Sequence, residues 1–165
     1  MTQRDFIDSI KIEEEDTLKG KYLIFNLGKE LYGMEIRYIT EIIGIQPITQ
    51  VPEMPNYVKG VTNLRGKIIP VMDARLRFKK EEREHDGRTC IIVIDTNDLA
   101  IGLIADSVAE VLTLEDEDIA PPPEINKTGN RYIKGIGKND DKVILLLDCQ
   151  LLLSEDDLEQ IKSAE

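Results

Sequence analysis

Nucleophilic or metal-based catalysis would have to use a small set of side chains in this sequence. His85 is the only histidine, and it lies between Glu84 and Asp86 in a densely charged segment without apolar periodicity. A serine or cysteine nucleophile needs a histidine held beside it, and a zinc site needs several histidine or cysteine ligands. We therefore interpret His85 as a solvated loop residue, and Cys90 and Cys149 as buried, reduced thiols.

Carboxylates are abundant, and the most regular pair has two interpretations. Asp73 and Asp148 each end an apolar run, where they could act as a general acid and base or cap the turn or helix that follows. A single acid in each run favours capping. The acidic residues 115–118 lack the spacing of a calcium-binding EF-hand, so we expect a solvated loop there. Neither GxxxxGK[ST] nor GxGxxG is present, and we expect no cofactor and no metal.

The elements that would position these side chains are encoded twice. Residues 57–73 match residues 132–148, which lie 75 positions later. The earlier parts of the two halves match at an offset of 69, as Glu41 and Glu110 do. The offsets differ because the second half has a longer loop within residues 115–130. We infer one supersecondary unit that has been duplicated.

Arg65 is the clearest difference between the two copies. It lies in the segment 62–66, and the later counterpart, residues 137–141, has no arginine. A guanidinium group binds carboxylates through a planar fork of donors and is a frequent interface anchor. Arg65 could therefore contact a partner, or it could form an intramolecular ion pair with Glu41. The two alternatives are compatible.

Short strands are predicted through most of each copy. Residues 22–27 and 90–95 are rich in β-branched and aromatic residues, and turn formers follow both. The runs 68–72 and 143–147 are continuously apolar, which predicts strands buried on both faces. Isoleucines at positions 36, 39 and 42 have helical spacing. Because these residues are β-branched, we expect one helical turn and then a strand from about Glu41.

About five short strands in each copy predict an all-β protein made of two small antiparallel barrels. The alternative is one two-sheet sandwich with internal symmetry. A copy of roughly 60 to 65 residues is marginally stable alone, so we expect a third apolar contact zone between the units. We expect a flexible segment at 1–17, a first barrel at 18–83 and a second at 84–153. A short C-terminal helix, 154–163, should pack on the first barrel.

Charge and hydropathy exclude several classes of protein. The net charge of −11 argues against a nucleic-acid or anionic-membrane binder, because both need a basic surface. No apolar run approaches the ~20 residues of a membrane-spanning helix, and the first residues lack the apolar region of a secretory signal. These features predict a cytoplasmic protein.

The segment 60–75, GVTNLRGKIIPVMDAR, resembles the signature of the CheW-type chemotaxis coupling proteins. The similarity extends from about Lys21 to Leu153, and Ala74 departs from the leucine usual in the family. This resemblance implies two tandem SH3-like five-stranded barrels packed together. It also implies a noncatalytic adaptor that links the cytoplasmic tips of methyl-accepting chemoreceptors to the regulatory domain of the chemotaxis histidine kinase, at membrane-associated receptor arrays.

The resemblance further implies two binding surfaces. An apolar groove between the barrels would receive a receptor helix, and the matching positions are Ile36, Ile39, Glu41, Ile42, Arg65, Val108 and Val111. The alternative for the isoleucines and valines is that they form the core between the barrels. The kinase would contact a barrel end, at Lys138, Asn139, Asp140, Asp141 and Lys142.

A competing hypothesis is an enzyme that acts on a small molecule in the groove between the barrels. Asp73, Asp148 or Glu41 would then serve as acid or base. This hypothesis requires a concave pocket that holds carboxylates with shifted pKa values.

Overall fold

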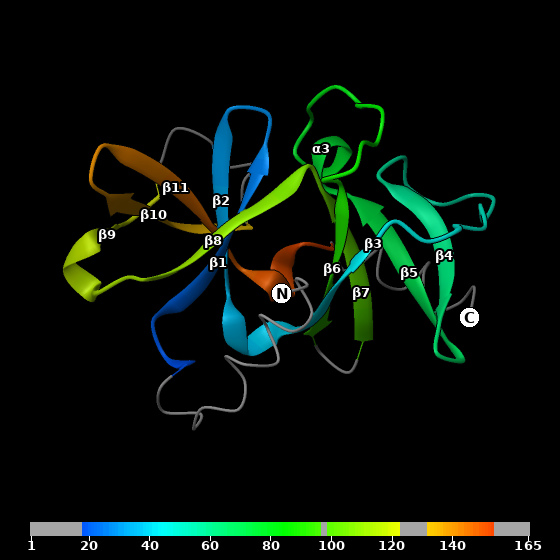
Figure 1. Cartoon of the computed structure of the whole chain (residues 1–165), viewed down its shortest axis with the longest axis horizontal. Coiled ribbons are helices and arrows are strands. Elements are labelled where there is room, and N and C mark those ends of the chain that lie inside the picture. The colour runs from blue at the N-terminus through cyan, green and yellow to red at the C-terminus, as the bar shows by residue number, and fades with distance from the viewer. Residues whose placement is uncertain (1–17, 97–98, 123–131, 154–165) are drawn as a thin grey trace.

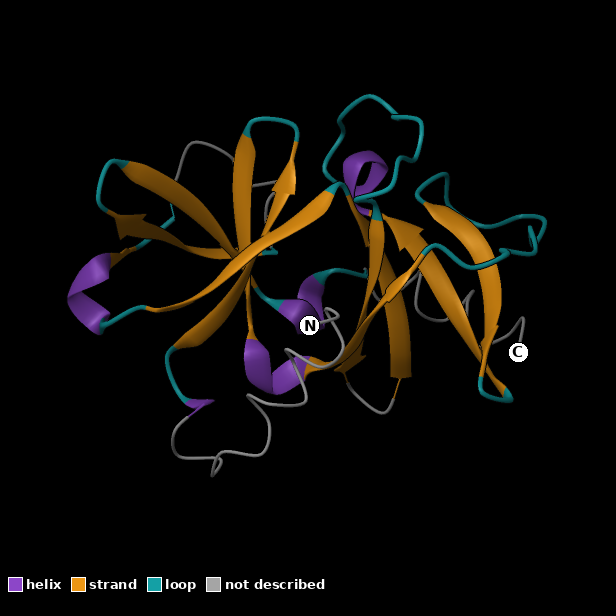
Figure 2. Ribbon diagram, viewed as in Figure 1, coloured by secondary structure: helices purple, strands orange, loops and turns teal. Residues whose placement is uncertain are grey.

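The computed structural model describes residues 18–96, 99–122 and 132–153, and these residues form mostly strands (Figures 1 and 2). The strands make two sheets, each curled into a barrel. The predicted all-β fold of two SH3-like barrels is thus confirmed. The expected flexible segment 1–17 and the expected helix 154–163 lie outside the described residues.

Barrel A is a six-stranded sheet with the order β8-β1-β2-β11-β10-β9. Its strands are β1 (Lys21–Leu27), β2 (Glu30–Glu35), β8 (Ser107–Thr113), β9 (Ile119–Ala120), β10 (Ile133–Asn139) and β11 (Lys142–Leu147). The 3-10 helix η2 (Asp116–Asp118) leads from β8 into β9, and η3 (Cys149–Leu151) follows β11.

Barrel B is a five-stranded sheet with the order β3-β6-β7-β5-β4. Its strands are β3 (Ile39–Gly44), β4 (Val58–Leu64), β5 (Lys67–Asp73), β6 (Cys90–Thr96) and β7 (Leu99–Ala105). The barrel closes where Thr49, beyond the end of β3, pairs with Val61 of β4 through two backbone hydrogen bonds. The helix α3 (Ala74–Arg77) follows β5, and the 3-10 helix η1 (Ile36–Tyr38) joins β2 to β3.

The two copies of the repeat exchange their first hairpins. The β1–β2 hairpin lies between β8 and β11, and the β6–β7 hairpin lies between β3 and β5. The only parallel pairs among the described strands, β2–β11 and β5–β7, join one copy to the other. The expected boundary between residues 83 and 84 therefore does not follow the sheets, because barrel A combines residues 21–35 with strands after residue 106 (Figure 1).

The one-residue connection between β7 and β8 explains part of this exchange. Asp106 alone separates β7 from β8, and three residues separate β2 from β3. A tight hairpin needs a loop of about two residues in a special turn, so β8 cannot fold back beside β7. β7 and β8 therefore lie in different barrels, as β2 and β3 do, and each barrel contains strands from both copies.

β-Bulges explain the helix-like spacing of the isoleucines. The pairing of β3 with β6 shifts register between Ile39 and Glu41. In a regular strand Ile39 and Ile42 would point to opposite faces, whereas the extra residue places both on one face. The single helical turn expected before this strand is present as η1. An equivalent shift occurs where β8 pairs with β1.

Three apolar clusters fill the molecule. Alternate residues of β1 divide between two of them: Tyr22 and Ile24 pack inside barrel A, while Leu23, Phe25 and Leu27 face a larger cluster that both barrels contribute to. A third cluster fills barrel B around Val71 and Ile91. The larger cluster, which we call the shared core, is the third contact zone expected between two units that are marginal alone.

Equivalent residues meet where the two copies face each other. The Arg77 guanidinium lies over the rings of Tyr57 and Tyr132, 5.0 and 4.7 Å from their centres. These tyrosines are repeat counterparts, and so are Arg77 and Leu152, whose backbone oxygen accepts a hydrogen bond from Arg77 Nε. A pseudo-twofold axis therefore passes close to Arg77. Each cation–π contact contributes about 0.5–2 kcal/mol to the packing of the copies.

Candidate functional site

Arg65 and Glu41 form a two-pronged ion pair on barrel B. Arg65 Nη1 lies 2.6 Å from Glu41 Oε2, and Nη2 lies 2.9 Å from Oε1. The Glu41 side chain is 11% exposed, whereas that of Arg65 is 50% exposed. The predicted intramolecular pair is thus confirmed. Because half of the Arg65 side chain remains exposed, the pair holds it in an orientation that a partner can reach.

The turn between β4 and β5 sets the direction of Arg65. Arg65 and Gly66 have φ angles of 55° and 87°, as in the tight hairpin turn that uses two left-handed residues. The side chain of Asn63 accepts a hydrogen bond from the Gly66 amide at 2.8 Å. A left-handed backbone costs a non-glycine residue about 1–2 kcal/mol. The ion pair and the Asn63 contact offset this cost and hold the turn.

Burial separates the expected receptor positions into two groups. The side chains of Ile36, Ile39 and Ile42 are 0%, 0% and 2% exposed and belong to the shared core. This agrees with the alternative that the isoleucines are core residues, and it leaves them no surface for direct contact. Val108 and Val111 are half-buried, pack against the same core, and lie opposite Phe25 and Leu23 of β1.

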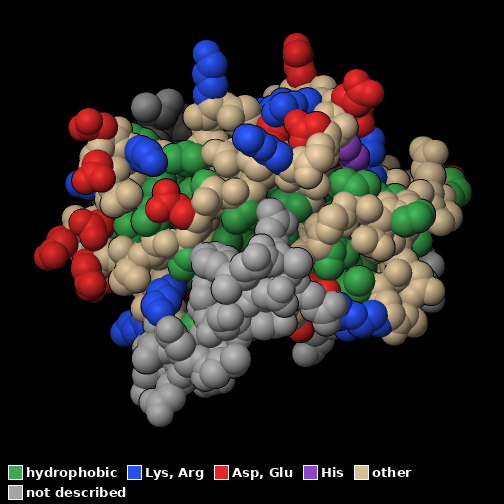
Figure 3. Space-filling view, in the orientation of Figure 1, with side chains coloured by type: hydrophobic (Ala, Val, Ile, Leu, Met, Phe, Trp, Pro, Cys, Tyr) green, Lys and Arg blue, Asp and Glu red, His purple; other side chains and the backbone are tan. Residues whose placement is uncertain are grey.

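The positions expected to contact the kinase form the β10–β11 hairpin. Lys138, Asp140, Asp141 and Lys142 are exposed, and Asn139 is half-buried. Lys142 Nζ lies 3.9 Å from Glu110 Oε2. Glu110 is the counterpart of Glu41, so the buried arginine pair of barrel B is replaced in barrel A by a loose, solvated lysine pair. Figure 3 shows acidic side chains gathered at this end of barrel A.

Two exposed apolar residues lie beside the hairpin turns and were missed in the sequence. Ile68 of β5 is 50% exposed and its counterpart Val143 of β11 is 59% exposed. The continuous apolar runs predicted burial on both faces, and this is wrong for the first residue of each run. Each is the second residue of its strand and pairs there only with the preceding strand of the hairpin. Periodicity alone carries no signal of this.

The two strand-ending aspartates are caps, as the sequence favoured. Asp73 accepts hydrogen bonds from the amides of Arg75 at 2.8 Å and Leu76 at 3.3 Å. Burial raises the pKa of Asp73, although these hydrogen bonds and Lys59 oppose the shift. Asp148 accepts a bond from the amide of Gln150 at 3.0 Å. Their carboxylate oxygens hold chain turns in place.

The remaining reactive residue types agree with their predicted roles. His85 is exposed in the charged connector. Residues 115–117 are exposed as well, although the segment expected to be a loop contains the 3-10 helix η2 and Asp118 is half-buried. Cys90 and Cys149 are buried free thiols, and burial raises the pKa of each to about 12, which suppresses the reactive thiolate. Within the described residues, no group of histidine, cysteine or carboxylate side chains could hold a metal ion. The described helices also include none with the length and hydropathy to cross a bilayer.

Comparison with known proteins relates this chain to a family. A profile described as the CheW-like domain matches residues 21–157. The chain is 36% identical over 144 residues to the chemotaxis protein CheW of Klebsiella aerogenes, and the match covers 87% of both chains. It is 34% identical over 144 residues to the chemotaxis protein CheW of Helicobacter pylori, again over 87% of both. The crystal structure of the scaffolding protein TtCheW from Thermoanaerobacter tengcongensis is similar with a TM-score of 0.77 and 36% identity, over 84% of this chain and 90% of that one.

Proposed function

The chain belongs to the family of proteins with a CheW-like domain, and from this premise we propose that it is a noncatalytic adaptor of bacterial chemotaxis. It links the cytoplasmic tips of methyl-accepting chemoreceptors to the regulatory domain of the chemotaxis histidine kinase. It works in the cytoplasm, where receptor arrays recruit it to the membrane. Similarity to proteins named for chemotaxis and scaffolding supports this assignment.

One observation carries the proposal: a duplicated fold presents unlike surfaces at equivalent places. The hairpin of barrel B holds Arg65 in a tight ion pair, while the equivalent hairpin of barrel A has exposed side chains of both charges and only a loose lysine pair. An adaptor needs two different surfaces, because it transmits a signal only when both partners bind together. Many such linked contacts add avidity in an array, so moderate affinity at each surface is enough.

We assign the receptor surface to the exposed Arg65, the buried Glu41 that holds it, and the two half-buried valines of the expected set. Glu41 and Arg65 supply a fixed charged pair on barrel B, and Val108 and Val111 supply apolar contact on β8. An amphipathic helix can press its apolar face against the valines and place a carboxylate against the open half of Arg65. The receptor surface is supported from the shared core by Ile36, Ile39 and Ile42, which hold η1 and β3 in position.

We assign the kinase surface to the β10–β11 hairpin. The exposed residues of 138–142 surround Val143, whose exposure makes it the natural apolar centre of a contact. Packing of a related barrel against this end would bury Val143 inside a polar rim.

The enzyme hypothesis has less support. Glu41 is engaged by Arg65, and Asp73 and Asp148 are engaged by backbone amides. The three carboxylates proposed as acid or base therefore have structural roles.

The experiment that tests the adaptor function is co-sedimentation with a receptor cytoplasmic fragment and with the kinase, separately and together. We expect each partner to bind alone and both to bind at once, and we expect kinase activity in the ternary assembly to depend on this protein. Competition between the two partners for the protein would contradict the assignment of separate surfaces.

The repeat supplies a matched pair of substitutions for the kinase surface. Val143→Asp should weaken binding of the kinase regulatory domain about tenfold or more, because apolar anchors at the centre of a contact carry much of its affinity. Ile68→Asp makes the same change at the equivalent position of barrel B and should leave this affinity unchanged. Isothermal titration with the isolated kinase domain measures both. Equal losses in the two variants would move the kinase surface away from β11.

A further inference from the structure

Asp106 is the one residue at which the chain crosses from barrel B to barrel A between β7 and β8. The equivalent crossing, from β2 to β3, takes the three residues of η1. The repeat counterpart of Asp106 there is Arg37, which pairs with its neighbour Glu35 at 3.4 Å. The duplication therefore does not require an acid at position 106.

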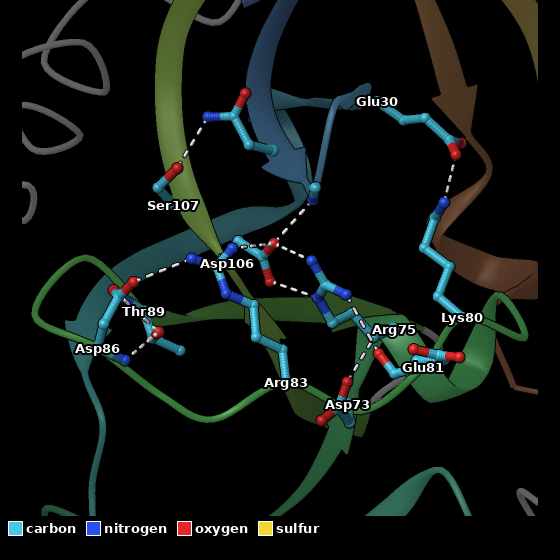
Figure 4. A network of polar contacts seen from close by, with 12 residues as sticks. Glu30, Asp73, Arg75, Lys80, Glu81, Arg83, Asp86, Thr89, Asp106 and Ser107 are labelled. Atoms are coloured by element: carbon cyan, nitrogen blue, oxygen red, sulfur yellow. Dashed lines mark hydrogen bonds and ion pairs between the residues drawn. The ribbon is translucent and has the colours of Figure 1, made fainter.

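The Asp106 carboxylate gathers donors from three separate segments (Figure 4). Arg75 of α3 donates from Nε at 2.8 Å and from Nη2 at 2.6 Å. Arg83 of the connector donates from Nη1 at 3.0 Å, and the amide of Gly28 in the β1–β2 turn donates at 2.7 Å. Arg75 belongs to barrel B and Gly28 to barrel A, so one carboxylate ties the barrels together.

Neighbouring positive charges keep the largely buried Asp106 carboxylate ionised. The Asp106 side chain is 12% exposed. Burial alone would raise the pKa of Asp106, but hydrogen bonds from Arg75 and Gly28 and the nearby positive charges lower it to about 2. The carboxylate is thus ionised at every physiological pH, and its removal would leave two arginines without their shared partner.

The cluster sets the place at which β8 begins. The Asp106 amide donates to the backbone oxygen of Asn26 at 3.2 Å, and the Asn26 side chain donates to Ser107 Oγ at 2.8 Å. The bulge of β8 follows directly, between the positions of Val108 and Glu110. Val108 lies two residues beyond Asp106, so a shift at the crossing would move this side chain and the bulge that aligns it with Val111.

We propose that Asp106 is a positioning residue, which holds the start of β8 so that Val108 and Val111 present one apolar edge to a partner helix. The carboxylate itself is largely covered and acts through the strand. The part of this inference that concerns binding rests on the proposed receptor surface. The part that concerns the order of β8 does not.

The test compares Asp106→Asn with Asp95→Asn, an exposed aspartate of β6 whose neutralisation changes the net charge equally. Amide hydrogen exchange of the free proteins should be faster at Ser107 and Val108 in Asp106→Asn, by about tenfold if local opening becomes easier. Titration with a receptor cytoplasmic fragment should show about fivefold weaker binding for this variant. Asp95→Asn should match the unmodified protein in both measurements.

Arg83→Gln provides a milder second variant, because it removes one donor and leaves Arg75 in place. It should show smaller changes in the same direction, and the double variant should bind no more weakly than Asp106→Asn alone. A purely structural role would lower the unfolding free energy without this non-additive effect on affinity.

Each outcome decides the matter. Unchanged exchange at residues 107 and 108, or faster exchange with unchanged affinity, would overturn the positioning role. If the unmodified protein fails to bind the receptor fragment, the proposed receptor surface is wrong, and the exchange data alone then decide whether Asp106 orders β8.

Discussion

Gly60→Ala is expected to lower the unfolding free energy by about 4 kcal/mol or more, which is exceptional for the addition of one methyl group. Gly60 has a φ angle of 147°, and a Cβ atom built there would lie 2.1 Å from the backbone oxygen of Thr49. The strained backbone alone costs about 1–3 kcal/mol. The clash can be relieved only by separating Thr49 from Val61, which breaks the hydrogen bonds that close barrel B.

The repeat provides the control at Gly135, the counterpart of Gly60 in β10. A Cβ atom there would lie 3.1 Å from Ile119 Cγ2 and 3.3 Å from the oxygen of Ala120. These neighbours can move by a few tenths of an ångström, so Gly135→Ala should cost only about 1–2 kcal/mol. Urea denaturation followed by circular dichroism measures both variants. Equal losses of stability would show that closure of barrel B does not depend on the Thr49 bridge.

Arg65→Glu is expected to weaken binding of the receptor fragment by about tenfold or more, because it reverses the charge of the accessible half of the Glu41–Arg65 pair. It also places a second carboxylate beside Glu41, whose side chain is 11% exposed. Loss of a buried partner costs about 3–5 kcal/mol, but the half-exposed arginine reduces this, and we expect about 1–3 kcal/mol of lost stability. Binding must therefore be measured at a temperature at which the variant is fully folded.

The exchanged pair Glu41→Arg with Arg65→Glu separates two roles of Arg65. The double variant restores opposite charges across the barrel edge, so stability should recover in large part. Affinity for the receptor fragment should remain low, because the accessible group is now a carboxylate. Calorimetric titration of the single and double variants provides the measurement. Recovery of affinity in the double variant would mean that Arg65 acts only by holding Glu41, and that the partner contacts neither charge directly.

Local chemistry made several features of the site predictable from the sequence. The Glu41–Arg65 pair and the aspartate caps depend on residue types and on positions within one copy of the repeat. Burial of the cysteines follows from the apolar runs beside them, in β6 for Cys90 and around η3 for Cys149. The chemical difference between residues 62–66 and their counterparts 137–141, which an adaptor with two unlike surfaces needs, was also visible in the sequence.

Exposure was harder to predict, because it depends on neighbours from elsewhere in the chain. Ile39 and Ile42 have the spacing of a helix face but lie in a bulged strand whose inner face is fully buried. Ile68 and Val143 lie in apolar runs but point away from the barrels. The position of Asp106 in the sequence does not indicate which groups contact its carboxylate. Gly28 is 78 residues away in the chain, Arg75 is 31 and Arg83 is 23.

By itself the sequence determined the strands, the turns, the caps and the duplication, because each arises from interactions among residues close together in the chain. Only the tertiary structure decided which hairpin joins which barrel. The two copies have similar apolar faces, so either hairpin could complete either set of strands. The one-residue crossing at Asp106 and the shared core select the exchanged arrangement, since a strand that cannot turn back must bury its apolar face against the other copy.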